Sequence, residues 1–495
     1  MKKYVLPIIF IWLLTGAAWF KILNQTLIGE GGYYNYIHRF FSGHDGFPLS
    51  LFRYDAGARL IYDLVRSVFN DNLLPFQYIM LLGVTLVGVC FYFLVYELTH
   101  RRGIAGIAAI LFSINFSTVF EMIAIGNFQF FGQRVAQLVP EFFSFLFFVR
   151  SMKRKSVTLG VLSLIFLAIA LLFAQYGIFF VPFYIIYAIA FVTIEKNDRS
   201  RKAFALILTG FSILVSYGVL RLGIVYGGGS YAQGVNIVQF VVESYKQFPI
   251  QIVRQLTILT VPDTVIRRVI SMVDRSYNDG IVLFYIPVIL LYLGSAILLW
   301  KRESILRAII FTSLTFLPVI FVLNLLMRGD EVTKIYTSSR YLHLAGVSFS
   351  IFWAIASYSM IKRGLLGSLF VGVLLIWWML NNIGSIWKEI DKEAYQHIAV
   401  KKSLQYVRNL APTFSTDSII IVPSELGYYG SYYVQIFYGK EKTAIYPYFS
   451  NWANELLRPF DLKKDVILEY DLERETIIDR TEQYREIIAE RTAEP

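Results

Sequence analysis

Residues 29–66 read GEGGYYNYIHRFFSGHDGFPLSLFRYDAGARLIYDLVR, and they lie between two long apolar runs. This stretch is rich in acids, histidine, arginine and tyrosine, so it is too polar to lie in hydrocarbon. A helix needs about 20 apolar residues to cross a hydrocarbon core of ~30 Å, and the flanking runs have that length. The same alternation continues along the chain and predicts an α-helical polytopic membrane protein.

The composition points to the same class. Of the 495 residues, 56% are hydrophobic and 16% are charged, whereas soluble chains carry about 25% charged residues. Much of the net charge of +11 falls in short turns such as His100–Arg102 and Arg150–Lys155. Basic turns on one side of a membrane are the positive-inside signal, so the charge calls for no nucleic-acid partner. Cys90 is the only cysteine, which excludes intrachain disulfides and multi-cysteine metal sites.

The apolar runs predict about eleven transmembrane helices. The expected spans are 4–22, 77–98, 104–118, 134–151, 157–174, 178–194, 203–223, 281–300, 305–327, 341–361 and 365–384. Because each turn assigned to the inside carries Lys or Arg, the amino terminus is expected in the cytoplasm and the carboxyl terminus outside. The first run has no small-residue cleavage site, so it is expected to stay as an uncleaved helix. The protein would thus be a multi-pass protein of the inner or plasma membrane.

Further regions are expected outside the membrane. The transmembrane module 1–384 has external loops at 23–76 and 224–280, and residues 385–495 are predicted to form a small external α/β domain. Its short strands are expected at 418–422, 442–446 and 465–469. The charged tail beyond Asp471 is expected to be helical or frayed.

Glu30 is the leading catalytic residue on sequence grounds. It follows the first span after a short polar spacer and precedes Gly31, Gly32 and the Tyr33–Tyr34 pair. Glycines let a substrate approach the backbone, and an acid beside them at the membrane boundary can act as a general base. A solvated acid beside interfacial tyrosines is the alternative, and the residues alone leave both open.

Two more charged positions have a functional and a structural interpretation. Arg340 stands where an external loop re-enters the membrane, which suits a lipid phosphate or an interfacial anchor. Arg134, Gln137 and Glu141 share one helix face. An ionisable group at that depth is paired or faces a cavity, so an Arg134–Glu141 pair or a polar cavity wall is favoured over catalysis.

The sequence resembles the GT-C superfamily of membrane glycosyltransferases that use polyprenyl-phosphate sugars, in the manner of dolichyl-phosphate-mannose and aminoarabinose transferases. The likeness is carried by Glu30 and the Tyr33–Tyr34 pair after the first span. It is also carried by His44-Asp45-Gly46-Phe47-Pro48 with an amphipathic stretch behind it, and by Arg340-Tyr341 at the start of the tenth span.

In that family the acid of the first loop is the proposed base that activates the acceptor, and this position falls on Glu30. The sequence lacks the adjacent acidic pair of many members, which leaves Asp45 and Asp55 open as bases and weakens any case for a bound metal. His44 has no third ligand at metal-binding spacing, so a polar role is favoured for it. No cofactor is expected.

The resemblance implies an inverting glycosyltransferase that moves a sugar from a polyprenyl-phosphate donor to a glycan, lipid or protein acceptor on the external face. Arg340 would hold the lipid phosphate together with Arg267 or Arg268. Further substrate-binding residues would be Tyr33, Tyr34, His44, Arg134 and Tyr341. A transporter or flippase of lipid-linked glycans and a non-catalytic scaffold of the same fold are the alternatives. The two halves show no sequence repeat, which disfavours the transporter.

Overall fold

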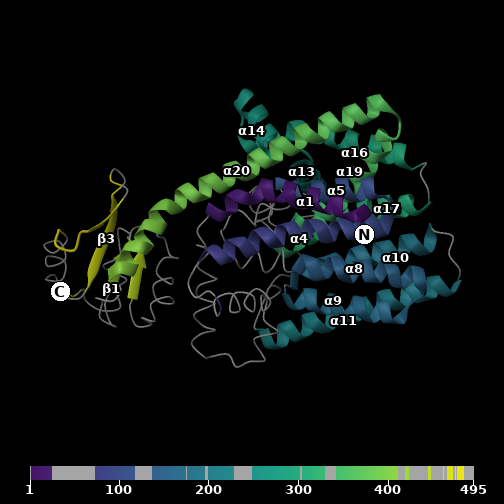
Figure 1. The fold of residues 1–495 in the computed structure, drawn as a ribbon, viewed down its shortest axis with the longest axis horizontal. Helices are drawn as coiled ribbons and strands as arrows, with labels where there is room; N and C mark the ends of the chain where they lie inside the picture. Colours follow the sequence, from purple (N-terminus) through teal and green to yellow (C-terminus); the bar gives the residue numbers. More distant parts are fainter. Residues whose placement is uncertain are drawn as a thin grey trace.

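In the computed structural model, apolar helices form a bundle that one long helix, α20, joins to a small β-sheet (Figure 1). The structure describes residues 2–24, 68, 73–116, 137–173, 175–194, 199–227, 248–300, 304–328, 342–410, 419–422, 444–447, 461, 465–471, 474 and 476–483.

The bundle combines long apolar helices with short connecting ones. Its first half contains α1 (Lys2–Trp19), η1 (Phe20–Asn24), α4 (Leu73–Thr99), α5 (Arg102–Ile114), α8 (Gln137–Arg154), α9 (Val157–Phe173), η4 (Gln175–Phe180), α10 (Val181–Thr193) and α11 (Arg199–Gly227). Its second half contains α13 (Phe248–Thr260), α14 (Asp263–Met272), α15 (Tyr277–Gly280), η5 (Ile281–Phe284), α16 (Tyr285–Leu299), α17 (Ser304–Arg328), α19 (His343–Ile361) and α20 (Leu365–Leu410).

Seven helices within the described residues are long and apolar enough to cross a membrane. They cover Val5–Leu23, Tyr78–Thr99, Arg199–Val219, Ile281–Leu299, Ile305–Leu323, His343–Ile361 and Leu365–Asp391. Three shorter apolar helices are Arg102–Ile114, Val157–Phe173 and Gly177–Thr193. α8 occupies the fourth predicted span, but Glu141 and a basic last turn interrupt its apolar sequence. The chain is therefore a helical membrane protein, and the count of eleven spans stays a prediction.

Aromatic rings and small residues pack the interior of the bundle. Phe91 of α4, Phe112 of α5 and Phe142 of α8 meet with ring centroids 4.7, 5.2 and 5.7 Å apart. Gly88 allows the close approach of α4 to α5, because a Cβ at this position would clash with Ser113 Oγ. Membrane helices associate largely through such packing, since the hydrophobic effect does not act between them in lipid.

Within the described residues, the carboxyl-terminal region contains a four-stranded sheet in the order β2-β1-β3-β4. Its strands are β1 (Ile419–Val422), β2 (Ala444–Pro447), β3 (Val466–Asp471) and β4 (Thr476–Asp479). β1 lies parallel to β2 and β3, with Ile420 opposite Ile445 and Val466. Three of these strands lie where the sequence predicts them. The tail prediction is wrong at β4, because residues 476–479 pair antiparallel with β3 instead of forming a helix or a frayed end.

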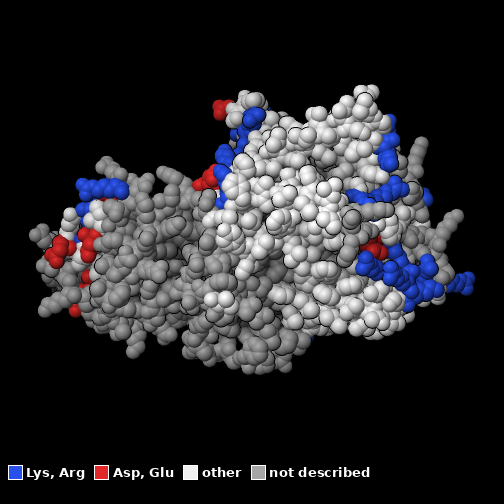
Figure 2. Space-filling view, viewed as in Figure 1, with Lys and Arg blue, Asp and Glu red and all other residues white. Residues whose placement is uncertain are grey.

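Charge divides the two ends of the bundle. Basic side chains gather at the end where the α4–α5, α8–α9, α10–α11 and α19–α20 turns lie, at the right in Figure 2. Glu97 is bound there by two of them, at 2.8 Å from Arg150 Nε and, through its backbone oxygen, at 2.9 Å from Lys153 Nζ. Partial burial and the nearby Lys153 lower the pKa of His100 from its usual value, against a smaller opposite effect of Glu97. At the other end, acidic and basic side chains are mixed around α14 (Figure 2).

Candidate functional site

A cleft of about 540 Å³ opens between α14 and α20. These two helices meet at the end of the bundle away from the basic turns (Figure 1). Its volume falls in the range of roughly 300–1,000 Å³ that small-molecule sites occupy. It is lined by Phe116, Asp263, Thr264, Arg267, Arg268, Ser271, Ser385, Lys388 and Glu389. Five of these nine residues are charged, and they gather at the point where α20 leaves its apolar section.

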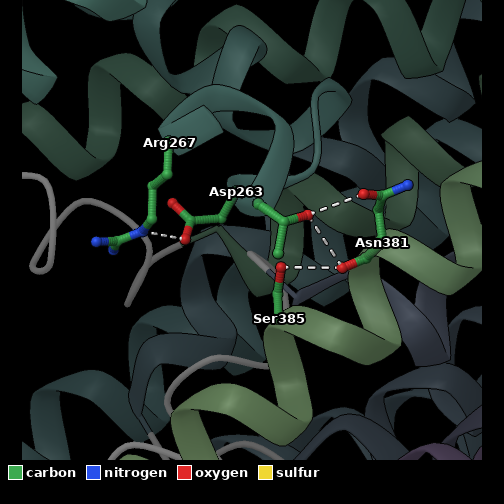
Figure 3. A network of polar contacts seen from close by, with 5 residues as sticks. Asp263, Arg267, Asn381 and Ser385 are labelled. Atoms are coloured by element: carbon green, nitrogen blue, oxygen red, sulfur yellow. Dashed lines mark hydrogen bonds and ion pairs between the residues drawn. The ribbon is translucent and has the colours of Figure 1, made fainter. Parts of the chain in front are cut away.

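Hydrogen bonds fix α14 against α20 (Figure 3). Thr264 Oγ1 donates to Asn381 Oδ1 at 3.1 Å and also lies 3.4 Å from the Asn381 backbone oxygen. Ser385 Oγ donates to the same backbone oxygen at 3.0 Å. Neighbouring Asp263 and Arg267 form an ion pair at 2.5 Å within the first turns of α14. The contact between Thr264 and Asn381 thus joins the two walls of the cleft, while the other two contacts lie within α20 and within α14.

The end of α13, which leads into α14, is fixed by contacts from three sides. Trp378 Nε1 of α20 donates to the Thr260 backbone oxygen at 3.2 Å. Tyr292 of α16 lies 3.3 Å from Thr260 Oγ1, and Asn115 Nδ2 donates to the Leu259 backbone oxygen at 2.9 Å. Since buried polar groups are seldom left without partners, this set of bonds specifies one position for the start of α14.

The opposite side of α20 is attached to the end of α1. Trp387 Nε1 donates to the Ala18 backbone oxygen at 3.0 Å. Lys21 Nζ forms an ion pair with Asp391 at 2.5 Å and lies 5.3 Å from the Trp387 ring centroid. α20 is therefore held on both sides at the level of the cleft, and the first loop of the sequence starts just after this attachment point.

The cations of the cleft differ in how far they are neutralised. Arg267 is paired with Asp263. The acidic Glu389 also lines the cleft and is only 9% exposed. Arg268 of α14 and Lys388 of α20 are exposed, and neither side chain forms an ion pair within the described part of the chain. Two such cations on facing walls suit an anionic group, because charge-assisted hydrogen bonds to phosphate oxygens are among the strong ones.

The structure places two of the predicted site residues together. Arg267 and Arg268 are adjacent on α14 and both line the cleft. The other predicted site residues lie outside the described residues: Glu30, Tyr33, Tyr34, His44, Asp45, Asp55, Arg134, Arg340 and Tyr341. Within the described ranges, no three His, Cys, Asp or Glu side chains come together as a metal site.

Sequence reasoning missed the residues that α20 contributes. Ser385, Lys388 and Glu389 follow the expected end of the last span at residue 384, where a change of region was predicted. The helix instead continues to Leu410, and it carries these side chains past α14. The signal was present as a polar, charged turn directly after an apolar run, which commonly marks a membrane boundary.

Of the polar face predicted on the fourth span, the structure describes Gln137 and Glu141 on α8. Glu141 is fully buried, and Gln137 Nε2 donates to its Oε2 at 3.0 Å. Gly177 of η4 lies against this pair, since a Cβ there would come within 3.0 Å of Gln137 Nε2. The expected pairing of Glu141 with Arg134 involves a residue outside the described ranges, so it stays a prediction.

No family model and no curated protein sequence matches this chain. Solved structures of the Archaeoglobus fulgidus oligosaccharyltransferase are similar to it. The complex with Zn and sulfate shares 12% identity over 89% of this chain and 62% of its own, with a TM-score of 0.45. The apo form shares 13% identity over 98% and 68%, with a TM-score of 0.44. The AglB complex with an inhibitory peptide and a dolichol-phosphate shares 12% identity over 88% and 64%, with a TM-score of 0.42.

The chain thus spans 62% of the length of the first of these structures. At such identities and TM-scores, the likeness transfers no activity and no residue role.

Proposed function

We propose that this chain is an inverting glycosyltransferase of the GT-C type, which moves a sugar from a polyprenyl-phosphate donor to an acceptor on the external side of the membrane. The observation that carries the proposal is the pair of exposed cations, Arg268 and Lys388, on facing walls of one cleft at the end of the apolar bundle. A lipid-linked phosphate needs such a site, with cations for the head and apolar helices beside them for the tail.

The charge distribution supports the orientation. Positively charged turns face the cytoplasm in most membrane proteins, and here they lie at the end away from the cleft (Figure 2). The cleft would then open on the external side of the membrane, and the loop 23–76 would lie on that same side. A lipid-borne sugar would then be bound and transferred on the external side of the membrane.

The chemistry requires positioning and one proton transfer. The acceptor hydroxyl oxygen attacks the anomeric carbon of the donor as the bond to the phosphate oxygen breaks. The lipid phosphate leaves with the bonding electron pair, and the acceptor proton passes to a carboxylate. Because phosphate is a good leaving group, holding the two substrates in line supplies much of the rate, and the base adds about 10²–10⁴-fold.

Glu30 is proposed as the base, with Asp45 and Asp55 as the alternatives in the same loop. Arg268 and Lys388 would bind the lipid phosphate, and Arg340 is proposed as a third phosphate ligand. Arg267 would act mainly through Asp263, which it neutralises at 2.5 Å. The remaining proposed substrate-binding residues are Tyr33, Tyr34, His44, Arg134 and Tyr341.

Incubating the purified protein with a panel of radiolabelled polyprenyl-phosphate sugars and acceptors tests the proposal. The expected result is transfer of label to one class of acceptor, with one polyprenyl phosphate released per sugar. A flippase would instead move the intact donor across a vesicle membrane without cleaving it. Recovery of every donor intact, in protein shown to be folded, would contradict the enzyme.

A further inference from the structure

Two basic turns at the end of the bundle away from the cleft share one tyrosine ring. Arg101 belongs to the α4–α5 turn, and Lys362 belongs to the α19–α20 turn. The Arg101 guanidinium carbon lies 5.8 Å from the ring centroid of Tyr358, and Lys362 Nζ lies 5.6 Å from it. Both distances lie within the ~6 Å of a cation–π contact. Cations far apart in the sequence are therefore brought to one point.

The backbone fixes this arrangement. The Tyr358 ring rests directly on Gly103, where a Cβ would lie 2.8 Å from Cε2 and 2.9 Å from Cδ2 of the ring. The Lys362 backbone N–H donates to the backbone carbonyl oxygen of Tyr358 at 3.1 Å. Gly364 follows with a φ of +118°, which turns the chain into α20 and which glycine adopts without strain. Both turns are thus preformed around the ring.

The two turns carry no acid. Their sequences are THRRG at 99–103 and IKRGL at 361–365, so each turn carries two Lys or Arg residues and no Asp or Glu. Lys362 and Arg363 form no ion pair within the part of the chain that the structure describes. Arg150, at the same end, differs because Glu97 neutralises it at 2.8 Å. Membrane orientation accounts for basic turns, but it does not require two cations at one ring.

Exposed apolar side chains continue directly from these cations. Leu365 is 75% exposed and Leu366 is 84% exposed in the first turn of α20, and Leu369 and Phe370 follow at 57% and 61%. A ligand that combines an anionic head with hydrocarbon chains matches this surface, with its head at the two turns and its chains along α20.

We infer that Arg101, Tyr358 and Lys362 bind the phosphate headgroup of an anionic glycerophospholipid from the surrounding bilayer. Basic sites between membrane helices are of the kind that hold anionic headgroups, and the apolar start of α20 selects a lipid over a free anion. This lipid site is separate from the α14–α20 cleft, and it does not depend on the proposed glycosyltransferase activity.

The test is a titration of the purified full-length protein in a neutral detergent with phosphatidylglycerol, followed by native mass spectrometry and by the thermal unfolding midpoint. Phosphatidylcholine and inorganic phosphate are titrated in parallel. The variant Arg101→Gln/Lys362→Gln is compared with Arg199→Gln/Lys202→Gln, which loses the same charge at the same end of the bundle.

Each basic side chain near an anionic lipid contributes roughly a fivefold factor in affinity. The variant of the lipid site should therefore bind phosphatidylglycerol roughly 20- to 30-fold more weakly, and the matched control should stay near the parent. If the double variant unfolds, Lys362→Gln alone is used, with an expected loss of about fivefold. Equal losses in both double variants would overturn the site. So would binding of inorganic phosphate as tight as that of phosphatidylglycerol, since the hydrocarbon chains would then contribute nothing.

Discussion

Removing both exposed cations of the cleft should weaken use of a polyprenyl-phosphate donor by roughly 30-fold. Arg268→Gln combined with Lys388→Gln takes one charge from each wall and leaves the Asp263–Arg267 pair intact. A hydrogen bond to a charged group contributes about 1.5–3 kcal/mol, whereas an exposed ion pair contributes about 0.2–1 kcal/mol. Because both side chains are exposed, about 1 kcal/mol each is the appropriate value. Together they give about 2 kcal/mol, or roughly 30-fold in KM.

The assay is the initial rate of sugar transfer as a function of donor concentration. The loss should fall on the donor KM and leave kcat nearly unchanged, because the phosphate is bound both before and during the reaction. Arg275→Gln, an exposed arginine just beyond α14, is the matched control for the loss of charge. A double variant whose donor KM equals that of the Arg275→Gln control would refute the phosphate site.

Three further outcomes are expected. Reporter fusions at Gly364 and Asp471 should report opposite sides of the membrane, because the basic turn at the former is expected inside; the same side at both would rule out the eleven-span topology. Arg340→Lys should weaken donor use although the charge is kept, since an ammonium group does not reproduce the planar fork of a guanidinium, and an unchanged KM would make Arg340 an anchor. The lowered pKa of His100 means that the unfolded chain binds a proton first as the pH falls below about 6.5, so the free energy of unfolding should decrease in that window. Asparagine tolerates the φ of 52° at this position. The thermal unfolding midpoint of His100→Asn should therefore fall less than that of the parent between about pH 7.5 and about pH 5.5. An equal fall in both proteins would contradict the assignment of this pH dependence to His100.

The helices of the bundle could be predicted because the membrane imposes a local rule. A spanning helix must satisfy its backbone internally and present apolar side chains over about 20 residues, and that pattern is visible in the sequence. The seven long helices accordingly fall on predicted spans. Three strands could be predicted for a similar reason, since runs such as Ile419–Val422 are short, apolar and β-branched.

β4 could not be predicted from its own residues. The segment from Thr476 to Asp479 is short and has charged neighbours, and its conformation depends on pairing with β3. Arg480 Nε, just after the strand, lies 3.0 Å from Glu469 Oε2 of β3. Tertiary context of this kind commonly overrides local strand preference.

Of the two walls of the cleft, only the one formed by α14 could be predicted from the sequence. Arg267 and Arg268 stood out as basic residues in a segment expected outside the membrane. Lys388 comes to line the cleft through the contact of α14 with α20, which is fixed by the bond between Thr264 and Asn381. These two residues are 117 positions apart, and no local pattern encodes their proximity.

The most direct test of the proposed mechanism is the transfer rate of Glu30→Gln, measured beside Asp45→Asn and Asp55→Asn with the same donor and acceptor. Glu30→Gln keeps the size and polarity of the side chain but cannot take up a proton, so transfer should fall by about 10²–10⁴-fold while donor binding is retained. The two aspartate variants should each lose less. Turnover near that of the parent in Glu30→Gln, with Asp55→Asn inactive, would move the role to Asp55, and full activity in all three would contradict a carboxylate base in this loop.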